Sequence, residues 1–310
     1  MLYFNFPDWL RPEIIPGFPV RWYGLMYLFA FFTAYLLFRK QIKDNALDWS
    51  KDEVSSLFTW GIAGLLLGAR LFATLVYDRT GRYLENPLLI FWPFDGDFSF
   101  VGFQGMSYHG GLIGVVIGII LFCRRKNKSI LQTTDLLVAA APFGYFFGRM
   151  GNFINGELYG RVTSCSLGMI FPAAERFPVR EEWVAEIMEK TGVSIVSGGL
   201  VNLPRHPSQL YEALFEGIVL GLLLWFVFRR FRLKPGIMTG LYLIGYGLVR
   251  FIIEYFREPD EELGFILSLS GENNPIWLCT SFLDFSMGQA LCLLMILAGT
   301  VLSGIILKRK

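Results

Sequence analysis

The sequence predicts an all-α, polytopic integral membrane protein with seven transmembrane helices, its N-terminus outside and its C-terminus in the cytoplasm. Hydrophobic residues make up 54% of the 310 residues and charged residues only 17%, whereas soluble domains carry about 25% charged residues. Several stretches approach or reach the roughly 17–25 apolar residues that a bilayer-spanning helix needs. The hydrophobicity excludes a disordered chain, and four cysteines in 310 residues exclude a secreted disulfide scaffold. The formal charge of +2 gives no support for nucleic-acid binding.

Seven hydrophobic segments account for the predicted helices, at residues 22–38, 54–77, 109–123, 136–148, 210–228, 236–256 and 285–307. The first and the last contain no charged residue, and the fourth runs directly into Arg149. Uncharged residues from position 98 onward precede the third. The residues before the first segment lack a basic region and an A-x-A cleavage site, so we expect the first span to stay in the mature protein.

The orientation follows from the positions of lysine and arginine. Four short segments, at 39–51, 124–128, 229–234 and 308–310, hold more than half of the 28 basic residues. They alternate with links of lower basic density, and the positive-inside rule places all four in the cytoplasm. An N-terminus outside and a C-terminus inside require an odd number of spans, which seven satisfies. We therefore expect a single seven-helix membrane domain over residues 1–310, with an external segment at about 161–205.

Glycine pairs spaced four residues apart recur inside these segments, at 64/68, 114/118, 217/221 and 236/240. Small residues at this spacing are typical of helices that pack closely in lipid. No glycine-rich run follows a strand and opens a helix, so the sequence predicts neither a dinucleotide site nor a P-loop.

Polar residues converge on the outer face in this topology. Ionisable groups at membrane depth are costly and usually functional, and both histidines, His109 and His206, fall at this face. Near the outer end of the sixth span, Tyr246, Arg250 and Glu254 are followed by Arg257 at spacings of 4, 4 and 3, which puts them on one helix face. An Arg–Glu pair at this spacing can instead serve only to neutralise two charges.

A second polar group follows the fourth span, where Arg149, Asn152, Asn155 and Glu157 form a dense set of hydrogen-bonding side chains. Arginine suits bidentate recognition of phosphate. Arg149 and Arg250 together therefore predict a clamp on an anionic headgroup.

The chemistry is limited by what the chain lacks. Two histidines and no His/Cys pair at ligand spacing predict no metal site, and we expect no cofactor. No serine nucleophile motif is present. Cys165 and Cys279 fall in external segments and can pair only if that compartment is oxidising. An enzyme of this kind would orient two substrates and manage charge.

Several stretches of the sequence, which include these polar residues, resemble one known family. GRMGNFINGELYGR at 148–161 is similar to the diagnostic motif of the bacterial phosphatidylglycerol–prolipoprotein diacylglyceryl transferases. Further stretches resemble the same family in the same order: RWYGLMYL at 21–28, MSYHGGLIG at 106–114, RHPSQLYE at 205–212, LIGYGLVRFIIEYFREPD at 243–260 and SMGQ at 286–289. The external stretch at 164–203 matches only loosely.

The resemblance implies transfer of the diacylglyceryl group of phosphatidylglycerol to the thiol of the lipobox cysteine of prolipoproteins, forming a thioether and releasing glycerol-1-phosphate. It places the protein in the bacterial inner membrane, among membrane lipids, with its active site towards the periplasm. The implied catalytic residues are His109, Arg149 and Arg250, with either His109 or Arg250 activating the thiol. The implied substrate-binding residues are Arg149, Asn152, Asn155, Glu157, Gly160, Tyr23, His206, Tyr246 and Glu254.

Two other functions remain open from the residues alone. A different lipid-headgroup enzyme would use the same arginines but would usually need a metal. A membrane transporter or channel with an outer-face anion site would spread its charges through the membrane depth instead of gathering them at one face.

Overall fold

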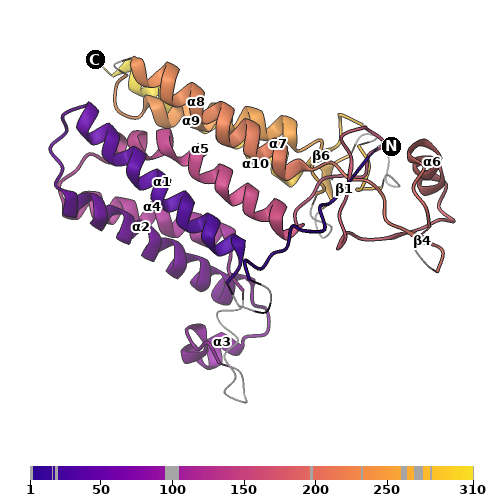
Figure 1. Cartoon of the computed structure of the whole chain (residues 1–310). Helices are drawn as coiled ribbons and strands as arrows, with labels where there is room; N and C mark the ends of the chain where they lie inside the picture. Colours follow the sequence, from indigo (N-terminus) through magenta and orange to yellow (C-terminus); the bar gives the residue numbers. More distant parts are fainter. Residues whose placement is uncertain are drawn as a thin grey trace. The chain divides into compact units, whose positions relative to one another are not determined.

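The computed structural model describes residues 3–15, 17, 20–94, 105–195, 198–231, 233–259, 264–268, 275–279 and 281–309, and it is mostly helical (Figure 1). Parts of the predicted segments, at 98–104, 196–197, 232, 260 and 310, lie outside the described residues. The chain divides into two compact units. The larger unit comprises Met1–Leu37 and Asp135–Lys310, and the smaller unit comprises Phe38–Thr134. The helices α1 (Trp22–Asp44) and α5 (Ile130–Asn155) each contribute residues to both.

The smaller unit is built on two helices that lie side by side, α2 (Lys51–Phe72) and α4 (Tyr108–Arg125) (Figure 1). The π-helical turn η1 (Ala73–Tyr77) continues α2, and the short α3 (Arg82–Glu85) and η2 (Pro87–Ile90) follow. A Cβ on Gly64 would lie 2.3 Å from the Gly114 carbonyl oxygen, and one on Gly68 would lie equally close to that of Gly110. The predicted close packing through glycines is therefore confirmed for this helix pair.

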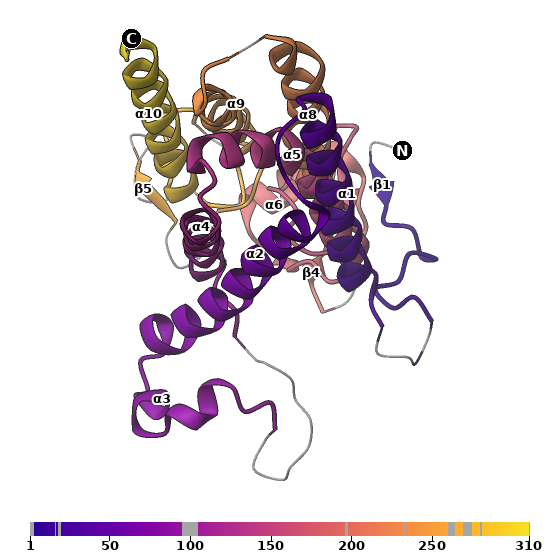
Figure 2. The same ribbon diagram turned by 90° about the vertical axis from the view of Figure 1, so that its left-hand side faces the viewer.

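The larger unit contains the remaining long helices. The stretch Ser208–Arg230 is one apolar helical span, composed of α7 (Ser208–Glu212), the π-helical η3 (Ala213–Val219), α8 (Leu220–Leu222), the π-helical η4 (Leu223–Val227) and η5 (Phe228–Arg230). Next come α9 (Ile237–Ile253) and α10 (Met287–Lys308), which pack against each other along their lengths (Figure 2). The first part of α1 packs on α5, with the Phe29 and Phe147 rings 5.8 Å apart.

One glycine pair does not pack as expected. Gly240 faces α10, where a Cβ would lie 3.0 Å from the Gly299 carbonyl oxygen. Gly236 instead precedes α9 with a φ of 99° and donates its N–H to Asp135 at 2.6 Å. Its role is to start the helix in a left-handed conformation that favours glycine.

Five helical stretches are long and apolar enough to cross a membrane, namely Lys51–Tyr77, Tyr108–Arg125, Ile130–Asn155, Ser208–Arg230 and Met287–Lys308. The predicted sixth span, α9, is apolar but only 17 residues long. The predicted first span, α1, is one continuous helix of 23 residues that carries Tyr23, Tyr27 and Tyr35, and it is not among these five. Large apolar side chains on α10, such as Leu294 and Leu297, are more than half exposed, as expected for a lipid-facing surface.

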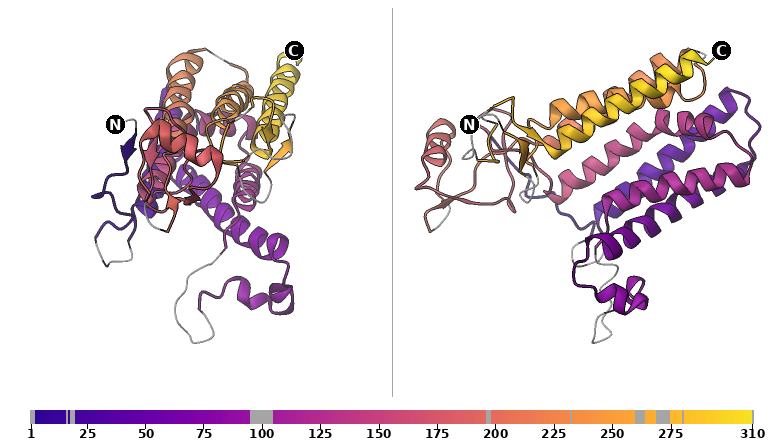
Figure 3. Two further views of the ribbon diagram at one scale, coloured as in Figure 1. Left: turned by 90° about the vertical axis from the view of Figure 1, so that its right-hand side faces the viewer. Right: turned by 180° about the vertical axis from the view of Figure 1, so that it is seen from behind.

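The segment that follows α5 forms a small folded region beyond the ends of α5 and α10 (Figure 3). Strand β1 (Phe4–Asn5) pairs in parallel with β2 (Met169–Ile170), and β3 (Phe177–Pro178) pairs antiparallel with β4 (Leu200–Val201). The helix α6 (Glu182–Thr191) packs Val184 into a core with Phe177 and Leu203. A third short pair joins β5 (Phe265–Leu267) to β6 (Phe285–Ser286). All four cysteines, Cys165 and Cys279 included, are free thiols.

Candidate active site

Glu212, the last residue of α7, lies at the centre of the largest group of buried charges described in the larger unit. Its side chain is fully buried, and three arginines surround it. Arg149 Nε is 2.6 Å from Glu212 Oε2, Arg250 NH1 is 2.9 Å from the same oxygen, and Arg257 NH1 is 3.3 Å from Oε1. Tyr145 completes what we call the Glu212 cluster, because its hydroxyl donates to Glu212 Oε2 at 3.2 Å.

Each arginine reaches this cluster from a different part of the fold. Arg149 comes from α5, where it lies one turn after Tyr145 and donates its Nε to the Tyr145 hydroxyl at 2.7 Å. Arg250 lies in the last turn of α9. Arg257 follows the end of that helix and is held in place by a backbone bridge to Gly160.

The predicted helix face at the end of the sixth span is correct for three of its four residues. Tyr246 and Arg250 lie within α9 and Glu254 is its C-cap, but the helix ends at Ile253, so Arg257 does not share the helix. Its side chain reaches Glu212 through a turn instead. Helical spacing alone could not indicate this, because the helix end is set by packing that lies outside the segment.

The expected Arg250–Glu254 pair is present, with NH2 2.9 Å from Oε2. Glu254 also accepts a hydrogen bond from Ser286 Oγ at 3.0 Å. Arg250 contacts Glu212 as well, so the pair does more than neutralise two neighbouring charges. The Tyr246 ring packs edge-on against Tyr145 at 5.8 Å, which places the predicted aromatic residue beside the cluster.

The polar group after the fourth predicted span comes together as expected. The helix α5 continues to Asn155, so Arg149 and Asn152 share a face, and Arg149 NH1 donates to Asn152 Oδ1 at 3.3 Å. Asn152 and Asn155 both donate to Glu157 Oε1, at 3.0 and 3.2 Å. These residues form a hydrogen-bonded chain that leads away from the Glu212 cluster.

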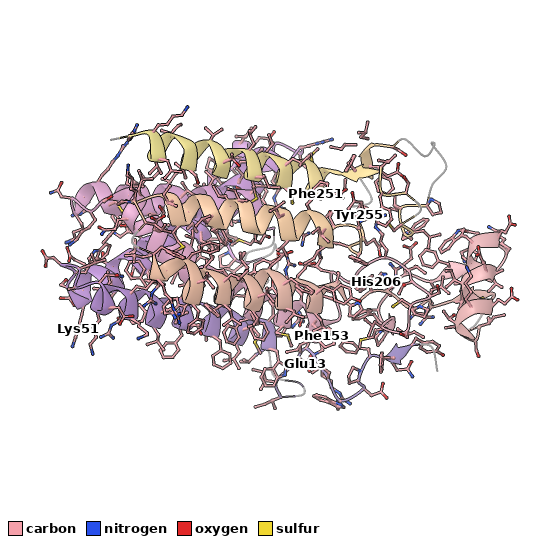
Figure 4. All side chains as sticks on the ribbon, turned by 90° about the horizontal axis from the view of Figure 1, so that it is seen from above. Glu13, Lys51, Phe153, His206, Phe251 and Tyr255 are labelled. Atoms are coloured by element: carbon pink, nitrogen blue, oxygen red, sulfur yellow. The ribbon has the colours of Figure 1, made fainter. Side chains whose placement is uncertain are left out.

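Gly160 and His206 lie together on neighbouring backbone segments. The Gly160 N–H donates to the His206 carbonyl at 2.8 Å, and a Cβ on Gly160 would lie 2.1 Å from the Phe256 carbonyl oxygen. His206, labelled in Figure 4 beyond the ends of the long helices, has its Nδ1 3.3 Å from the Tyr211 hydroxyl. Burial lowers the pKa of His206 to about 4, so the imidazole is neutral at physiological pH.

The remaining two predicted residues are Tyr23 and His109. Tyr23 hydrogen-bonds to Tyr27 at 3.1 Å, and its ring lies against α5, where a Cβ on Gly151 would be 3.0 Å from Tyr23 Cδ2. His109 belongs to the smaller unit, where it is the second residue of α4. Its side chain is exposed, and its Nδ1 is 2.8 Å from the Tyr77 hydroxyl.

The predicted site residues do not include Glu212, Glu216 or Tyr145. Glu216 lies one turn after Glu212 in the π-helical η3, is fully buried and is 3.6 Å from Arg250 NH1. Neither of its oxygens has a hydrogen-bond partner among the described residues. The available signal was a pair of acidic residues four apart in an apolar span, which is unusual at membrane depth.

The exposure of the charged groups suggests how the cluster can act. The arginine side chains are 17%, 13% and 14% exposed, while Glu212 beneath them is 0% exposed. The buried carboxylate therefore contacts three arginine side chains that each keep a small part of their surface exposed. Among the residues that the structure describes, no group of three or more His, Cys, Asp or Glu could hold a metal ion.

Comparisons with known proteins agree on one family. The family model described as prolipoprotein diacylglyceryl transferase matches residues 13–305. The phosphatidylglycerol–prolipoprotein diacylglyceryl transferase of Treponema pallidum (strain Nichols) is 50% identical, covering 96% of this chain and 94% of that protein. The protein of the same name from Treponema denticola is 48% identical (96% and 93% covered), and that from Borreliella afzelii is 42% identical (96% and 94% covered).

Proposed function

Since this chain belongs to the prolipoprotein diacylglyceryl transferase family, we propose that the Glu212 cluster is the site of its reaction. The protein is a multi-pass inner-membrane transferase. It transfers the diacylglyceryl group of phosphatidylglycerol to a cysteine thiol of prolipoproteins and releases glycerol-1-phosphate. The observation that carries the site assignment is the set of three partly exposed arginines held on one fully buried carboxylate.

The arginines bind the phosphate of the lipid headgroup. In the reaction, the thiolate sulfur bonds to a carbon of the glyceryl group, the carbon–oxygen bond to phosphate breaks, and its electron pair leaves with glycerol-1-phosphate. Negative charge therefore grows on the phosphate in the transition state. Arg149 and Arg250 are the principal donors, and each well-placed donor of this kind contributes about 3–4 kcal/mol.

The acceptor thiol loses its proton before or during attack. A free thiol has a pKa near 8.5 and reacts as the thiolate, so a nearby base or cation accelerates the step. His109 is one candidate base, and its Tyr77 hydrogen bond would orient the imidazole. Arg250 is the alternative, because its charge lowers the pKa of an approaching thiol.

The other predicted residues complete the substrate site. Asn152, Asn155 and Glu157 bind the headgroup glycerol or hold Arg149 in position, supported by the hydrogen bonds between them. Four further residues line the site or support its walls: Gly160, Tyr23, His206 and Tyr246. Glu254 fixes the direction of Arg250.

The topology belongs to the same proposal. Seven spans, with α1 and α9 added to the five stretches that are long and apolar enough to cross a membrane, put the N-terminus in the periplasm and the C-terminus in the cytoplasm. The basic residues in and after the last turns of α1 and α4 support this orientation. The Glu212 cluster then faces the periplasm, where it meets the lipobox cysteine of the precursor.

The test uses purified protein in detergent, phosphatidylglycerol radiolabelled in its acyl chains, and a lipobox peptide with one cysteine. We expect label on the peptide, release of glycerol-1-phosphate, no label on a peptide with serine in place of cysteine, and no transfer by Arg149→Ala. His109→Gln separates the two routes to the thiolate, because residual activity would assign that role to Arg250. Lipid binding without transfer to the thiol would contradict the site assignment and favour an anion-transport site.

A further inference from the structure

Arg257 is the one arginine of the Glu212 cluster that no helix carries. Arg149 lies within α5 and Arg250 within α9, where the helix fixes the direction in which each side chain leaves the backbone. Arg257 follows the end of α9, and its N–H bonds back to the Ile253 carbonyl at 3.1 Å. Its side chain nevertheless reaches Glu212 Oε1 at 3.3 Å. The rest of its position therefore depends on contacts from other segments.

The backbone around Arg257 is held by Arg161. The buried Arg161 side chain donates its Nε to the Arg257 carbonyl at 2.8 Å and its NH1 to the Leu278 carbonyl at 2.9 Å. The Arg161 N–H donates to the Phe256 carbonyl at 2.9 Å. One residue thus fixes two consecutive carbonyls, at positions 256 and 257.

The side chain that follows Arg257 is held by Arg205. The Arg205 side chain is fully buried, with its guanidinium carbon 4.8 Å from the centre of the Tyr159 ring and 5.3 Å from that of Phe177. Its NH1 donates to Glu258 Oε2. Its Nε and NH2 have no hydrogen-bond partner among the described residues. The charge of Arg205 is therefore directed at the carboxylate next to Arg257.

The backbones of Arg161 and Arg205 belong to one hydrogen-bonded set of segments. The N–H of His206, the residue after Arg205, donates to the Arg161 carbonyl at 2.9 Å. Arg205 and Met169 exchange both backbone hydrogen bonds, at 2.9 and 2.8 Å. Arg205 therefore extends from a backbone that is itself fixed on two sides, as a residue that orients another must be.

Stability alone does not account for the Arg205–Glu258 pair. Replacing a buried ion pair by uncharged residues of similar volume is often neutral or stabilising, because the two charges must be desolvated. Two guanidinium nitrogens of Arg205 without a partner add to this cost. What the pair does fix is the position of a side chain that directly follows Arg257.

We propose that Arg205 is a positioning residue for the transfer reaction. Through Glu258 it holds the turn after α9 in the conformation that directs Arg257 toward the Glu212 cluster. Arg205 itself touches no substrate. The inference rests on the proposed function, since the position of Arg257 affects transfer only if the Glu212 cluster binds the phosphate.

The test removes the pair and asks whether the loss acts through Arg257. Arg205→Gln alone leaves a carboxylate without its buried partner, which destabilises a protein. The main variant is therefore Arg205→Met combined with Glu258→Gln, which removes both charges and nearly keeps the size of both side chains. Val184→Ala is the control, because it truncates a fully buried core residue of the same region without removing a charge. Thermal unfolding is measured for every variant.

We expect the paired variant to lose about tenfold in kcat/KM for phosphatidylglycerol, a size typical of residues coupled in one salt-bridge network. In an Arg257→Gln background the same two changes should cost less than about twofold, because the side chain that they position is already absent. Val184→Ala should unfold at a lower temperature and keep its kcat/KM. Normal transfer by the paired variant, a tenfold loss in both backgrounds, or an equal loss in Val184→Ala would overturn the proposal.

NMR of protein labelled with the heavy nitrogen isotope in arginine separates this inference from the proposed function. The Nε–H signal of Arg257, assigned by its loss in Arg257→Gln, reports on that side chain whether or not transfer occurs. A shifted or weakened signal in the paired variant but not in Val184→Ala supports the positioning role, even if normal transfer by Arg149→Ala shows that the reaction takes place elsewhere. An unchanged signal would overturn the positioning role even if transfer proceeds normally.

Discussion

Replacing Glu212 by glutamine keeps the size of the side chain but removes the negative charge that three arginines share. The contacts at 2.6, 2.9 and 3.3 Å lose their electrostatic component together. Removing one partner of a buried ion pair destabilises a protein by about 3–5 kcal/mol. Guanidinium groups that are free to move are also no longer held in position to donate to the phosphate. We therefore expect kcat/KM to fall by about 10²–10³, the loss typical of one misplaced transition-state donor.

The matched control is Glu216→Gln. Glu216 is equally buried and lies one turn further along the same span, but its contact with Arg250 is 3.6 Å long and it has no described hydrogen-bond partner. We expect a change of less than about tenfold in this variant. Transfer to a cysteine peptide and thermal unfolding would be measured for both variants. Near-normal transfer by Glu212→Gln, or an equal loss in both variants, would refute the role given to Glu212.

Three further predictions concern the backbone, the pH response and helix packing. Gly160→Ala places a Cβ 2.1 Å from the Phe256 carbonyl oxygen, so kcat/KM should fall at least about tenfold by overpacking. The control Gly148→Ala, whose Cβ meets no atom within 4 Å, should remain active. Equal activities of the two variants would contradict this prediction. Burial lowers the pKa of His206 from 6.5 to about 4, so the contribution of this neutral imidazole to folding stability should be complete above about pH 6.5 and lost as the pH falls toward 4. The unfolding temperature should then fall more steeply with acid in wild type than in His206→Gln. Parallel curves for the two proteins would contradict this prediction. Gly114→Ala brings a Cβ 2.0 Å from a backbone oxygen of α2 and should lower the unfolding temperature by separating two helices, which an unchanged midpoint would disprove.

The sequence could predict the parts of the site that depend on spacing within one helix. Arg149 and Asn152 are three residues apart, a spacing that puts two side chains on one face of a helix, and α5 carries both in this way. The Arg250–Glu254 pair follows from the same rule. The family resemblance predicted the reaction, which agrees with the names of the relatives. The role of His109 stays a prediction.

The centre of the site could not be predicted in this way. Glu212 collects its partners from α5, from α9 and from the turn after α9, so its role depends on which helices pack together. Helical periodicity describes one segment at a time and contains no information on such partners. The same holds for β1 and β2, where Phe4 pairs with Met169. Strands of two residues have too little pattern to be found before their partner is known.

The division of the chain implies an order of assembly. The larger unit is discontinuous, because residues 38–134 are inserted between the part of α1 that packs on α5 and residues 135–155 of α5. At the usual 5–20 residues per second, roughly 100 inserted residues delay the arrival of α5 by about 5–20 s. During synthesis α1 is therefore present before its partner α5 has been made, and its Phe29 face contacts lipid or the insertion machinery. Completion of the Glu212 cluster comes later still, when α9 leaves the ribosome.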